Sequence, residues 1–419
     1  GGVVHDLLTA VNLAGTTVVD DLTVSDDLTV TDDLIVGGDI DLEGSIDVNG
    51  TLEADVITVN NIGGLSNVAN DLTIFSSSSG HNGLRFHLDG ILPTDNAGAI
   101  VDADADLGIE SYRFKDLFLS GIASAGGIIT PTAGTSNFVA GVNAGNSILS
   151  GGNYNTVVGD EAGTAITTGD GNTAIGYEAL KTVTTASNNT AIGLNALKLN
   201  TSGGQNTAVG RLSADALTEG SANVALGNAA LTADTLGSFS TAVGNAALGA
   251  QNFTTATDTY NTAVGYNAGT AVTTGIQNTL IGGLAGDSLT DADLNVAVGY
   301  GALSSDTLGS KSVAIGKNSL FTQNFTTATD TLNTGVGHNT GSNITTGVEN
   351  TLIGGLAGDA LTDADFNVAI GISSLGTDTL GSRSVAIGAE TLTTQNFTTA
   401  TNAYNVAIGY GVGRNITTG

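Results

Sequence analysis

A five-residue pattern, Asn-(Thr/Val)-Ala-(Ile/Val)-Gly, recurs fifteen times in the last two-thirds of this 419-residue chain. Asn172–Gly176 and Asn206–Gly210 are two clear copies. Successive copies start 17 residues apart, except that every fourth step from Gly244 on takes 21 residues and creates a 72-residue super-repeat. A fixed period of this kind is typical of a solenoid, in which stacked units bury one continuous core. The sequence therefore predicts a long, regular array.

The expected fold is all-β: an elongated β-solenoid, or β-roll, over residues 136–419, with about 15 coils of 17–21 residues. A 17-residue coil has a contour of about 56 Å at ~3.3 Å per residue, which suits two strands and two turns. Coils spaced ~4.8 Å apart would stack into a rod about 70 Å long. The low aromatic content, 5%, also favours thin layers of small and β-branched side chains.

The closing glycine is present in every copy of the pattern. Glycine permits backbone conformations and close approaches that other residues do not, so we expect each one to form a tight corner. The candidate corner residues are Gly176, Gly193, Gly210, Gly265, Gly282, Gly337, Gly354 and Gly409.

The first position of the pattern is Asn in twelve copies and Ser in the other three, at 240, 312 and 384. Two interpretations are open: a ladder of stacked amides that hydrogen-bond from coil to coil, or simple turn-forming residues. The regular column favours the ladder. The candidate ladder residues are Asn172, Asn189, Asn206, Asn278, Asn295, Asn350 and Asn367.

The middle of the pattern alternates between two faces of a strand. We expect the second and fourth residues, β-branched or Leu, to fill the inside of the coil. The third residue is almost always Ala and would then point outward. A single chain would leave this uncharged outward face exposed to solvent, which predicts contact with other copies of the chain.

The 21-residue coils carry the segments Gln251–Thr254, Gln323–Thr326 and Gln395–Thr398 ahead of the strand. Their four extra residues should bulge from one edge of the array. Each bulge holds a phenylalanine, which would either contact a partner or fold back over its own loop.

Two further regions precede the array. Residues 1–60 contain six hexads from Val19 to Ala54 with apolar fourth and sixth positions, which predict very short strands in a β-helical shaft. Six hexads are too few for a single-chain helix, so an intertwined shaft of several chains fits better. Residues 61–135 lack repeats and predict a small β connector module.

Charge excludes two classes of partner. The formal net charge is −30, with 40 acidic and 10 basic residues, which repels nucleic acid and anionic lipid. No apolar stretch is long enough to insert into a membrane. The chain lacks methionine and stops inside a repeat at Ile416–Gly419, so we expect the natural protein to extend beyond both ends.

The sequence offers little for catalysis. The four histidines, His5, His81, His87 and His338, are scattered, and there is no cysteine to complete a zinc site. Alternating aspartates at 102, 104 and 106, at 291 and 293, and at 363 and 365 are either solvated turns or weak Ca²⁺ ligands. We therefore expect no cofactor and no enzyme activity. A glycan-cleaving protein would need paired carboxylates in a groove, usually with aromatic platforms.

The strand pattern resembles the head repeats of trimeric autotransporter adhesins, which are homotrimeric, left-handed parallel β-rolls. Its 17-residue form is similar to repeats of bacteriophage tail fibres. The hexads resemble triple-stranded fibre shafts. The segments Ile91–Asn96 and Tyr112–Gly121 resemble a connector common in phage fibres. The order of shaft, connector and roll covers nearly the whole chain.

The resemblance implies a homotrimeric structural fibre of a virus particle, a phage tail fibre that extends and supports recognition of a host receptor. Its partners would be its own copies, other virion fibre or baseplate proteins, and a host surface receptor. It would lie in the virion, outside the cell. Two alternatives stay open: a trimeric adhesin on a bacterial cell surface, and a glycan-depolymerising tailspike.

Overall fold

The computed structural model describes residue 29, five strands between residues 56 and 94, and residues 132–419. These residues form strands, turns and bends without a helix. The chain divides into two units, residues 1–123 and 124–419. The hexads, apart from residue 29, and the second connector segment lie outside the described residues. The trimeric shaft predicted there is therefore still a prediction.

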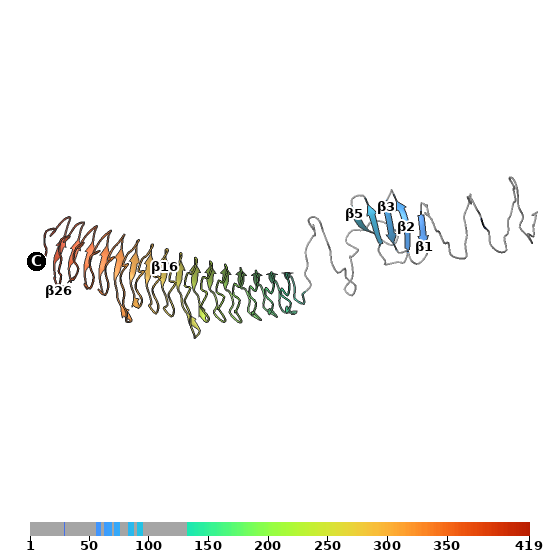
Figure 1. Ribbon diagram of the computed structural model, residues 1–419, viewed down its shortest axis with the longest axis horizontal. Helices are drawn as coiled ribbons and strands as arrows, with labels where there is room; N and C mark the ends of the chain where they lie inside the picture. Colours follow the sequence, from blue (N-terminus) through green and yellow to red (C-terminus); the bar gives the residue numbers. More distant parts are fainter. Residues whose placement is uncertain are drawn as a thin grey trace, which may run out of the picture. The chain divides into compact units, whose positions relative to one another are not determined.

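The first unit contains a five-stranded antiparallel sheet in sequential order (Figure 1). Each strand pairs with its neighbours in the chain, as in a meander. The first strand begins at residue 56, inside the segment assigned to the shaft. The strands are β1 (Val56–Val59), β2 (Gly63–Val68), β3 (Asp71–Phe75), β4 (Gly83–His87) and β5 (Gly90–Thr94).

The second unit is the predicted parallel β-solenoid. Its main sheet has sixteen strands, and each pairs in parallel with the strand of the next coil (Figure 1). Fifteen of the sixteen begin with Thr or Val, which suit an extended backbone. The strands are β6 (Phe138–Ala140), β7 (Thr156–Val158), β8 (Thr173–Ile175), β9 (Thr190–Ile192), β10 (Thr207–Val209), β11 (Val224–Leu226), β13 (Thr241–Val243), β15 (Thr262–Val264), β16 (Thr279–Ile281), β17 (Val296–Val298), β19 (Val313–Ile315), β21 (Thr334–Val336), β22 (Thr351–Ile353), β23 (Val368–Ile370), β25 (Val385–Ile387) and β27 (Val406–Ile408).

Two details of the coil differ from the prediction. The array has sixteen strands because Asn137–Gly141 is a further, divergent copy of the pattern. Moreover, an ordinary coil has one strand, not two, and the chain returns through turns. The turns follow the corner glycine and use left-handed backbone, for example at Glu178 and Leu180. A second strand cannot form across such residues.

The predicted orientation of the strand was wrong. The third residue, usually Ala, is buried inside the coil, whereas the second and fourth residues point outward and are half-buried or exposed. Ala174 is 0% exposed and Ile175 is 36% exposed. The reason is space: Leu side chains from the turn, such as Leu180, already occupy the inside of the flat coil. Only a methyl group fits opposite them.

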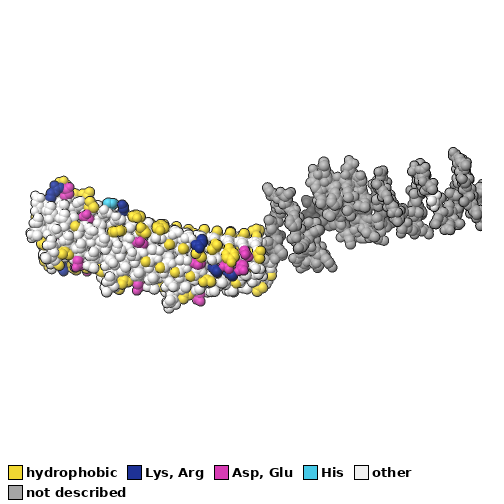
Figure 2. All heavy atoms as spheres, viewed as in Figure 1, with side chains coloured by type: hydrophobic (Ala, Val, Ile, Leu, Met, Phe, Trp, Pro, Cys, Tyr) yellow, Lys and Arg dark blue, Asp and Glu magenta, His cyan; other side chains and the backbone are white. Residues whose placement is uncertain are grey.

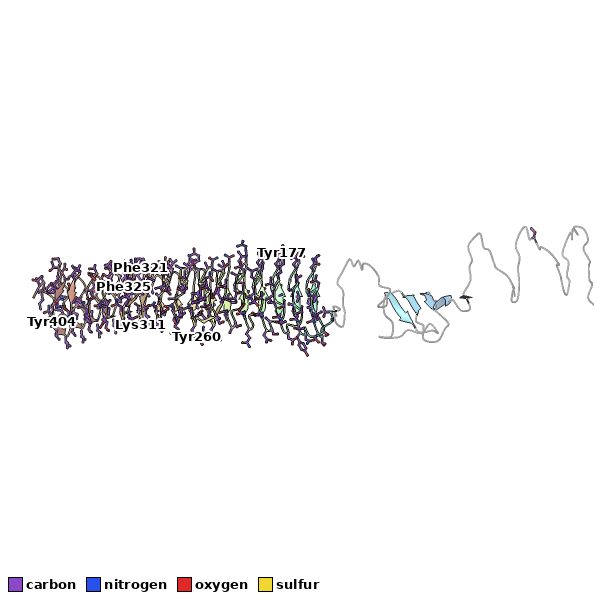
Figure 3. The ribbon with its side chains drawn as sticks, turned by 90° about the horizontal axis from the view of Figure 1, so that it is seen from below. Tyr177, Tyr260, Lys311, Phe321, Phe325 and Tyr404 are labelled. Atoms are coloured by element: carbon purple, nitrogen blue, oxygen red, sulfur yellow. The ribbon has the colours of Figure 1, made fainter. Side chains whose placement is uncertain are left out.

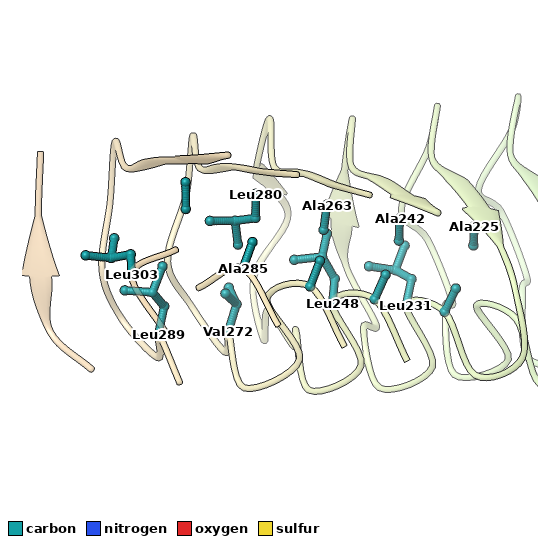
Figure 4. Packing of buried hydrophobic residues seen from close by; sticks show 14 of the residues in the cluster. Ala225, Leu231, Ala242, Leu248, Ala263, Val272, Leu280, Ala285, Leu289 and Leu303 are labelled. Atoms are coloured by element: carbon teal, nitrogen blue, oxygen red, sulfur yellow. The ribbon is translucent and has the colours of Figure 1, made fainter. Parts of the chain in front are cut away.

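The core keeps its volume by exchanging large and small residues (Figure 4). Where Leu280 replaces the strand alanine, the facing turn positions are Gly269 and Gly286 instead of Leu. A Cβ atom at Gly269 would lie 2.6 Å from Leu280 Cδ1, and one at Gly286 would lie 2.7 Å from Leu280 Cδ2. Leu352 repeats the arrangement between Gly341 and Gly358. The interior is thus close-packed along its length.

Each 21-residue coil adds a small ledge to one edge of the array. A ledge is a pair of two-residue parallel strands: β12 (Gly237–Ser238) with β14 (Thr257–Asp258), β18 (Gly309–Ser310) with β20 (Thr329–Asp330), and β24 (Gly381–Ser382) with β26 (Thr401–Asn402). Phe253 and Phe325 are 6% exposed, so they fold back beneath the ledge. The exposed tips are Thr254–Ala256 and their two counterparts.

Candidate functional site

The corner glycines have a backbone that only glycine adopts readily. In all fifteen copies identified from the sequence, φ lies between +125° and +144°. At Gly265 an added Cβ atom would lie 2.5 Å from the carbonyl oxygen of Gly282 in the next coil. The glycine therefore serves both its own conformation and the close stacking of neighbouring corners. The candidate corner residues all share this range of φ, and at all of them except Gly409, the last corner, an added Cβ atom would lie 2.3–2.7 Å from the carbonyl oxygen of the next corner glycine.

The asparagine column is a buried hydrogen-bonded ladder. The backbone N–H of Asn172 donates to Oδ1 of Asn155 at 2.9 Å, and the N–H of Asn189 donates to Oδ1 of Asn172 at 3.0 Å. Each Nδ2 group donates to a carbonyl fourteen residues later; for Asn172 this is Ala186, at 2.9 Å. Both ends of the amide are thus used between coils, and both asparagines are fully buried.

The remaining candidate asparagines repeat these bonds. The N–H of Asn278 donates to Oδ1 of Asn261 at 2.9 Å, and the N–H of Asn295 donates to Oδ1 of Asn278 at 3.0 Å. Direct amide-to-amide bonds are fewer and longer than these. The same ladder contacts hold Asn206, Asn350 and Asn367.

The ladder is interrupted at each serine and resumes in the following long coil. The N–H of Ser240 still donates to Oδ1 of Asn223, but serine has no amide to offer Asn261. Gln251 bridges the break: its Oε1 accepts from Asn261 Nδ2 at 2.9 Å, and its Nε2 donates to Ser240 Oγ at 2.8 Å. The same Nε2 lies 2.6 Å from Oδ2 of Asp234.

Asp234 is a fully buried carboxylate without a basic side chain among its hydrogen-bond partners. Its Oδ1 accepts from the backbone N–H groups of Gly237 and Phe253. Burial raises the pKa of this carboxyl, and the bond from Gln251 opposes that rise. Asp306 with Gln323, and Asp378 with Gln395, repeat the contact in the other two long coils.

The outer face of the main sheet is an uncharged surface that runs the length of the array. The first and third residues of the sixteen strands, which are the second and fourth residues of the five-residue pattern, form two columns of Thr, Val, Ile and Leu, with Phe138 and Ala140 at one end. No charged residue occurs in either column. In Figure 2, hydrophobic side chains line the edge of the array where the strand arrows of Figure 1 lie. We call these two columns the outer sheet face.

Exposed aromatic and charged residues flank this face on both sides. Figure 3 shows Tyr260, Lys311 and Tyr404 along one edge of the array and Tyr177 and Phe321 along the other. Phe239 stacks on Tyr260 with ring centroids 5.4 Å apart. The flanking residues vary from coil to coil, whereas the outer sheet face stays uncharged throughout.

Charged groups elsewhere hold neighbouring coils together. Lys181 lies 2.5 Å from Glu161 and 2.6 Å from Glu178, which also pairs with Lys198 at 2.6 Å. The hydrogen bonds from Lys181 and Lys198 lower the pKa of the Glu178 carboxyl to about 2. This alternation of charges across coils is a structural cluster, since every carboxylate in it is paired.

The aspartates considered as calcium ligands also connect coils. Asp291 accepts from Thr274 Oγ1 at 2.7 Å, and Asp293 accepts from the N–H of Ile276 at 2.8 Å. Asp363 and Asp365 repeat both bonds. Across residues 132–419, no three His, Asp or Glu side chains gather as a metal site would require. The aspartates at 102, 104 and 106 and the side chains of His5, His81 and His87 lie outside the described residues.

Sequence reasoning missed the buried Asp–Gln pair and placed the outer sheet face on the wrong side of the strand. The pair does leave a signal: Asp234 and Gln251 recur at 306 and 323 and at 378 and 395, always around a serine that replaces the ladder asparagine. The orientation has a weaker signal, the Leu residues of the turn, which compete for the same interior space.

The described part of the chain has no helix long and apolar enough to cross a membrane. Comparison with family models, with curated proteins and with solved structures gives no match for this chain.

Proposed function

We propose that this protein is a structural fibre of a virus particle, a phage tail fibre, whose array assembles as a parallel homotrimer through the outer sheet face. The observation that carries the proposal is that face: an uncharged, largely aliphatic surface on a chain with a net charge of −30. The number three follows the resemblance to trimeric β-rolls. The fibre extends from the virion, contacts other fibre or baseplate proteins, and supports recognition of a host receptor.

The dimensions of the outer sheet face suit self-association. Sixteen strands spaced ~4.8 Å apart give a face about 70 Å long, and two side-chain columns make it about 10 Å wide. The area is about 700 Å², close to the ~800 Å² per partner of a standard stable interface. Contiguous apolar surfaces larger than a few hundred Å² mark interaction sites.

Light scattering and sedimentation of the full chain test the assembly. We expect three times the mass of one chain for the parent. A variant with Ile281→Lys, Ile315→Lys and Ile353→Lys should dissociate, because these side chains lie on the outer sheet face at 38–39% exposure. Thr255→Lys, Thr327→Lys and Thr399→Lys place the same charge on the ledge tips and should leave the mass unchanged. A monomeric parent would refute the proposal.

Two further experiments test the biological role. An antibody against the array, viewed by electron microscopy, should label virions; labelling of bacterial cells without virions would favour a surface adhesin instead. Purified protein applied to an encapsulated host should leave the capsule intact, whereas clearing would indicate a depolymerase.

A further inference from the structure

The second position of the five-residue pattern is the first residue of each strand. It alternates between Thr and Val in bands that follow the super-repeat. From Thr262 to Val385, two successive strands present Thr and the next two present Val; Thr241 precedes this stretch and Val406 follows it. We call these groups the threonine bands and the valine bands. The threonine bands are Thr262 with Thr279 and Thr334 with Thr351, and the valine bands are Val296 with Val313 and Val368 with Val385.

The bands have no explanation inside one chain. Thr262 and Thr279 are direct neighbours in the sheet, yet none of the threonine-band hydroxyls makes a hydrogen bond within residues 132–419. These side chains point outward and are half-buried. Val occupies the same position two strands later with the same branched shape. The coil therefore accepts either residue, and their order is free to serve a partner.

We propose that the threonine and valine bands set the axial register between copies of this chain. The inference rests on the proposed self-association through the outer sheet face. With parallel copies in register, each threonine band lies at the height of its neighbours' threonine bands. A hydroxyl both donates and accepts, so threonines that meet can satisfy one another, while valines that meet bury methyl groups.

A shift along the axis breaks this match. A slip of two coils sets threonine bands against valine bands, and each hydroxyl then loses water without gaining a partner. A slip of four coils restores the match among the last strands. However, it sets Thr156 against Val224, Thr241 against Val313 and Thr334 against Val406, and it removes four coils of overlap. The order of bands therefore specifies one register, as a buried polar residue does in a coiled coil.

A band-inverted chain tests the inference directly. It carries Val at 262, 279, 334 and 351 and Thr at 296, 313, 368 and 385, so its total composition is that of the parent. Inverted copies again match one another in register. We expect the inverted chain to self-associate as the parent does, and mixed assemblies of parent and inverted chains to be at least about tenfold rarer than random mixing gives.

The readout is co-expression of two differently tagged chains, followed by sequential affinity capture and native mass spectrometry. Two tagged copies of the parent supply the random-mixing reference. A half-inverted chain, changed only at 334, 351, 368 and 385, should be depleted to an intermediate degree. Random mixing of parent with inverted chains, while each still self-associates, would overturn the register inference and leave the proposed function standing. An inverted chain that stays monomeric beside an assembling parent would overturn the inference too. A monomeric parent would sink both.

Discussion

The 17-residue coils and the three 21-residue coils satisfy their buried ladder asparagines with different hydrogen-bond partners. In an ordinary coil such as the one containing Asn278, the amide oxygen accepts from the backbone N–H of the asparagine one coil on, and the Nδ2 group donates to the Ala292 carbonyl. In a long coil the serine at the first position ends this exchange. A buried Gln and a buried Asp then take over, and the ladder resumes at Asn261. Successive 17-residue coils use the same ladder asparagine as a hydrogen-bond partner, whereas a 21-residue coil needs its own buried Gln and Asp.

The comparison shows why the insertion recurs as a set. The inserted residues form an exposed tip, which places few demands on the sequence. The energetic cost of the insertion arises in the buried interior of the coil, where Asn261 would lose the amide that accepts its hydrogen bond. The serine, the glutamine and the aspartate appear together in all three long coils because an unsatisfied buried polar group costs about 1–3 kcal/mol.

The largest effect is expected at a corner glycine, which both kinds of coil share. Gly265→Val should destabilise the coils around β15 by about 3 kcal/mol or more, because its φ is +143° and its Cβ atom would clash with the carbonyl of Gly282. Coils in a repeat array unfold locally, so hydrogen exchange of the amides in β13, β15 and β16 is the appropriate measurement.

A matched control lies close by. Gly283 has an ordinary φ, and an added Cβ atom would make ordinary contacts with the Tyr300 ring at 3.5 Å and the Tyr266 carbonyl oxygen at 3.9 Å. Gly283→Ala should leave exchange in the same strands nearly unchanged. Equal effects of the two substitutions would show that the corner conformation does not require glycine.

The next prediction compares the destabilisation caused by one substitution in each type of coil. Gln251→Leu removes the bonds to Asp234 and Ser240 and the acceptor for Asn261, so we expect a cost of about 3 kcal/mol. Asn278→Leu removes the bond to Ala292 and the acceptor for the N–H of Asn295, and should cost about 2 kcal/mol.

Gln277→Leu serves as the control, because Gln277 is exposed and its change should fall within about 0.5 kcal/mol. Urea unfolding monitored by hydrogen exchange ranks the three variants. If Asn278→Leu costs more than Gln251→Leu, the long coil is not the more demanding one.

Much of this fold could be read from periodicity. The constant spacing of one residue type, the closing glycine, predicts the strands, their parallel pairing, the 72-residue super-repeat and the tight corners. The sixteenth strand escaped because Phe138 and Val139 depart from the pattern, although Asn137 and Gly141 keep it. The direction of the strand escaped for a different reason. Alternation shows that two faces differ but not which one is inside, and that depends on how much volume the turn residues take.

The candidate site was likewise predictable from the sequence only in part. The asparagine ladder follows from a column of one residue type. The bonds themselves run mostly from backbone N–H to side-chain oxygen, which the sequence pattern does not distinguish from amide stacking. The Asp234–Gln251 contact joins two residues 17 positions apart in a segment where the repeat is disturbed. Only the recurrence of the pair with each serine points to it.

A smaller effect compares three equivalent carboxylates. Asp215 accepts from Thr232 and Asp287 accepts from Ser304, each at 2.5 Å, but the third super-repeat has Gly376 opposite Asp359. Burial raises the pKa of the Asp359 carboxyl. The protein is thus more stable with this group protonated, and that stability is lost as the pH rises through the raised pKa.

Gly376→Ser should supply the missing donor and stabilise the protein by about 1 kcal/mol near pH 7. Because the hydroxyl favours the charged carboxylate, the gain should shrink as the pH falls through the raised pKa of the Asp359 carboxyl. Gly376→Ala adds the Cβ atom without the hydroxyl, so any gain it gives should not depend on pH. Unfolding measured for both variants across this range decides the matter, and identical pH profiles would contradict the proposed donor.

The smallest effect concerns the third long coil, which lacks one hydroxyl of the network. In the first two, Thr259 and Thr331 each lie 2.5 Å from the ladder serine and donate to a carbonyl of the ledge. Ala403 holds the equivalent place beside Ser384. Ala403→Thr should therefore add two hydrogen bonds and stabilise this coil by about 0.5–1 kcal/mol. Ala403→Val has the same shape without the hydroxyl and should give no gain. Slower hydrogen exchange in β25 for the threonine variant, but not for the valine variant, is the expected result. If both variants slow exchange equally, the gain comes from packing, and the long coils tolerate an incomplete network.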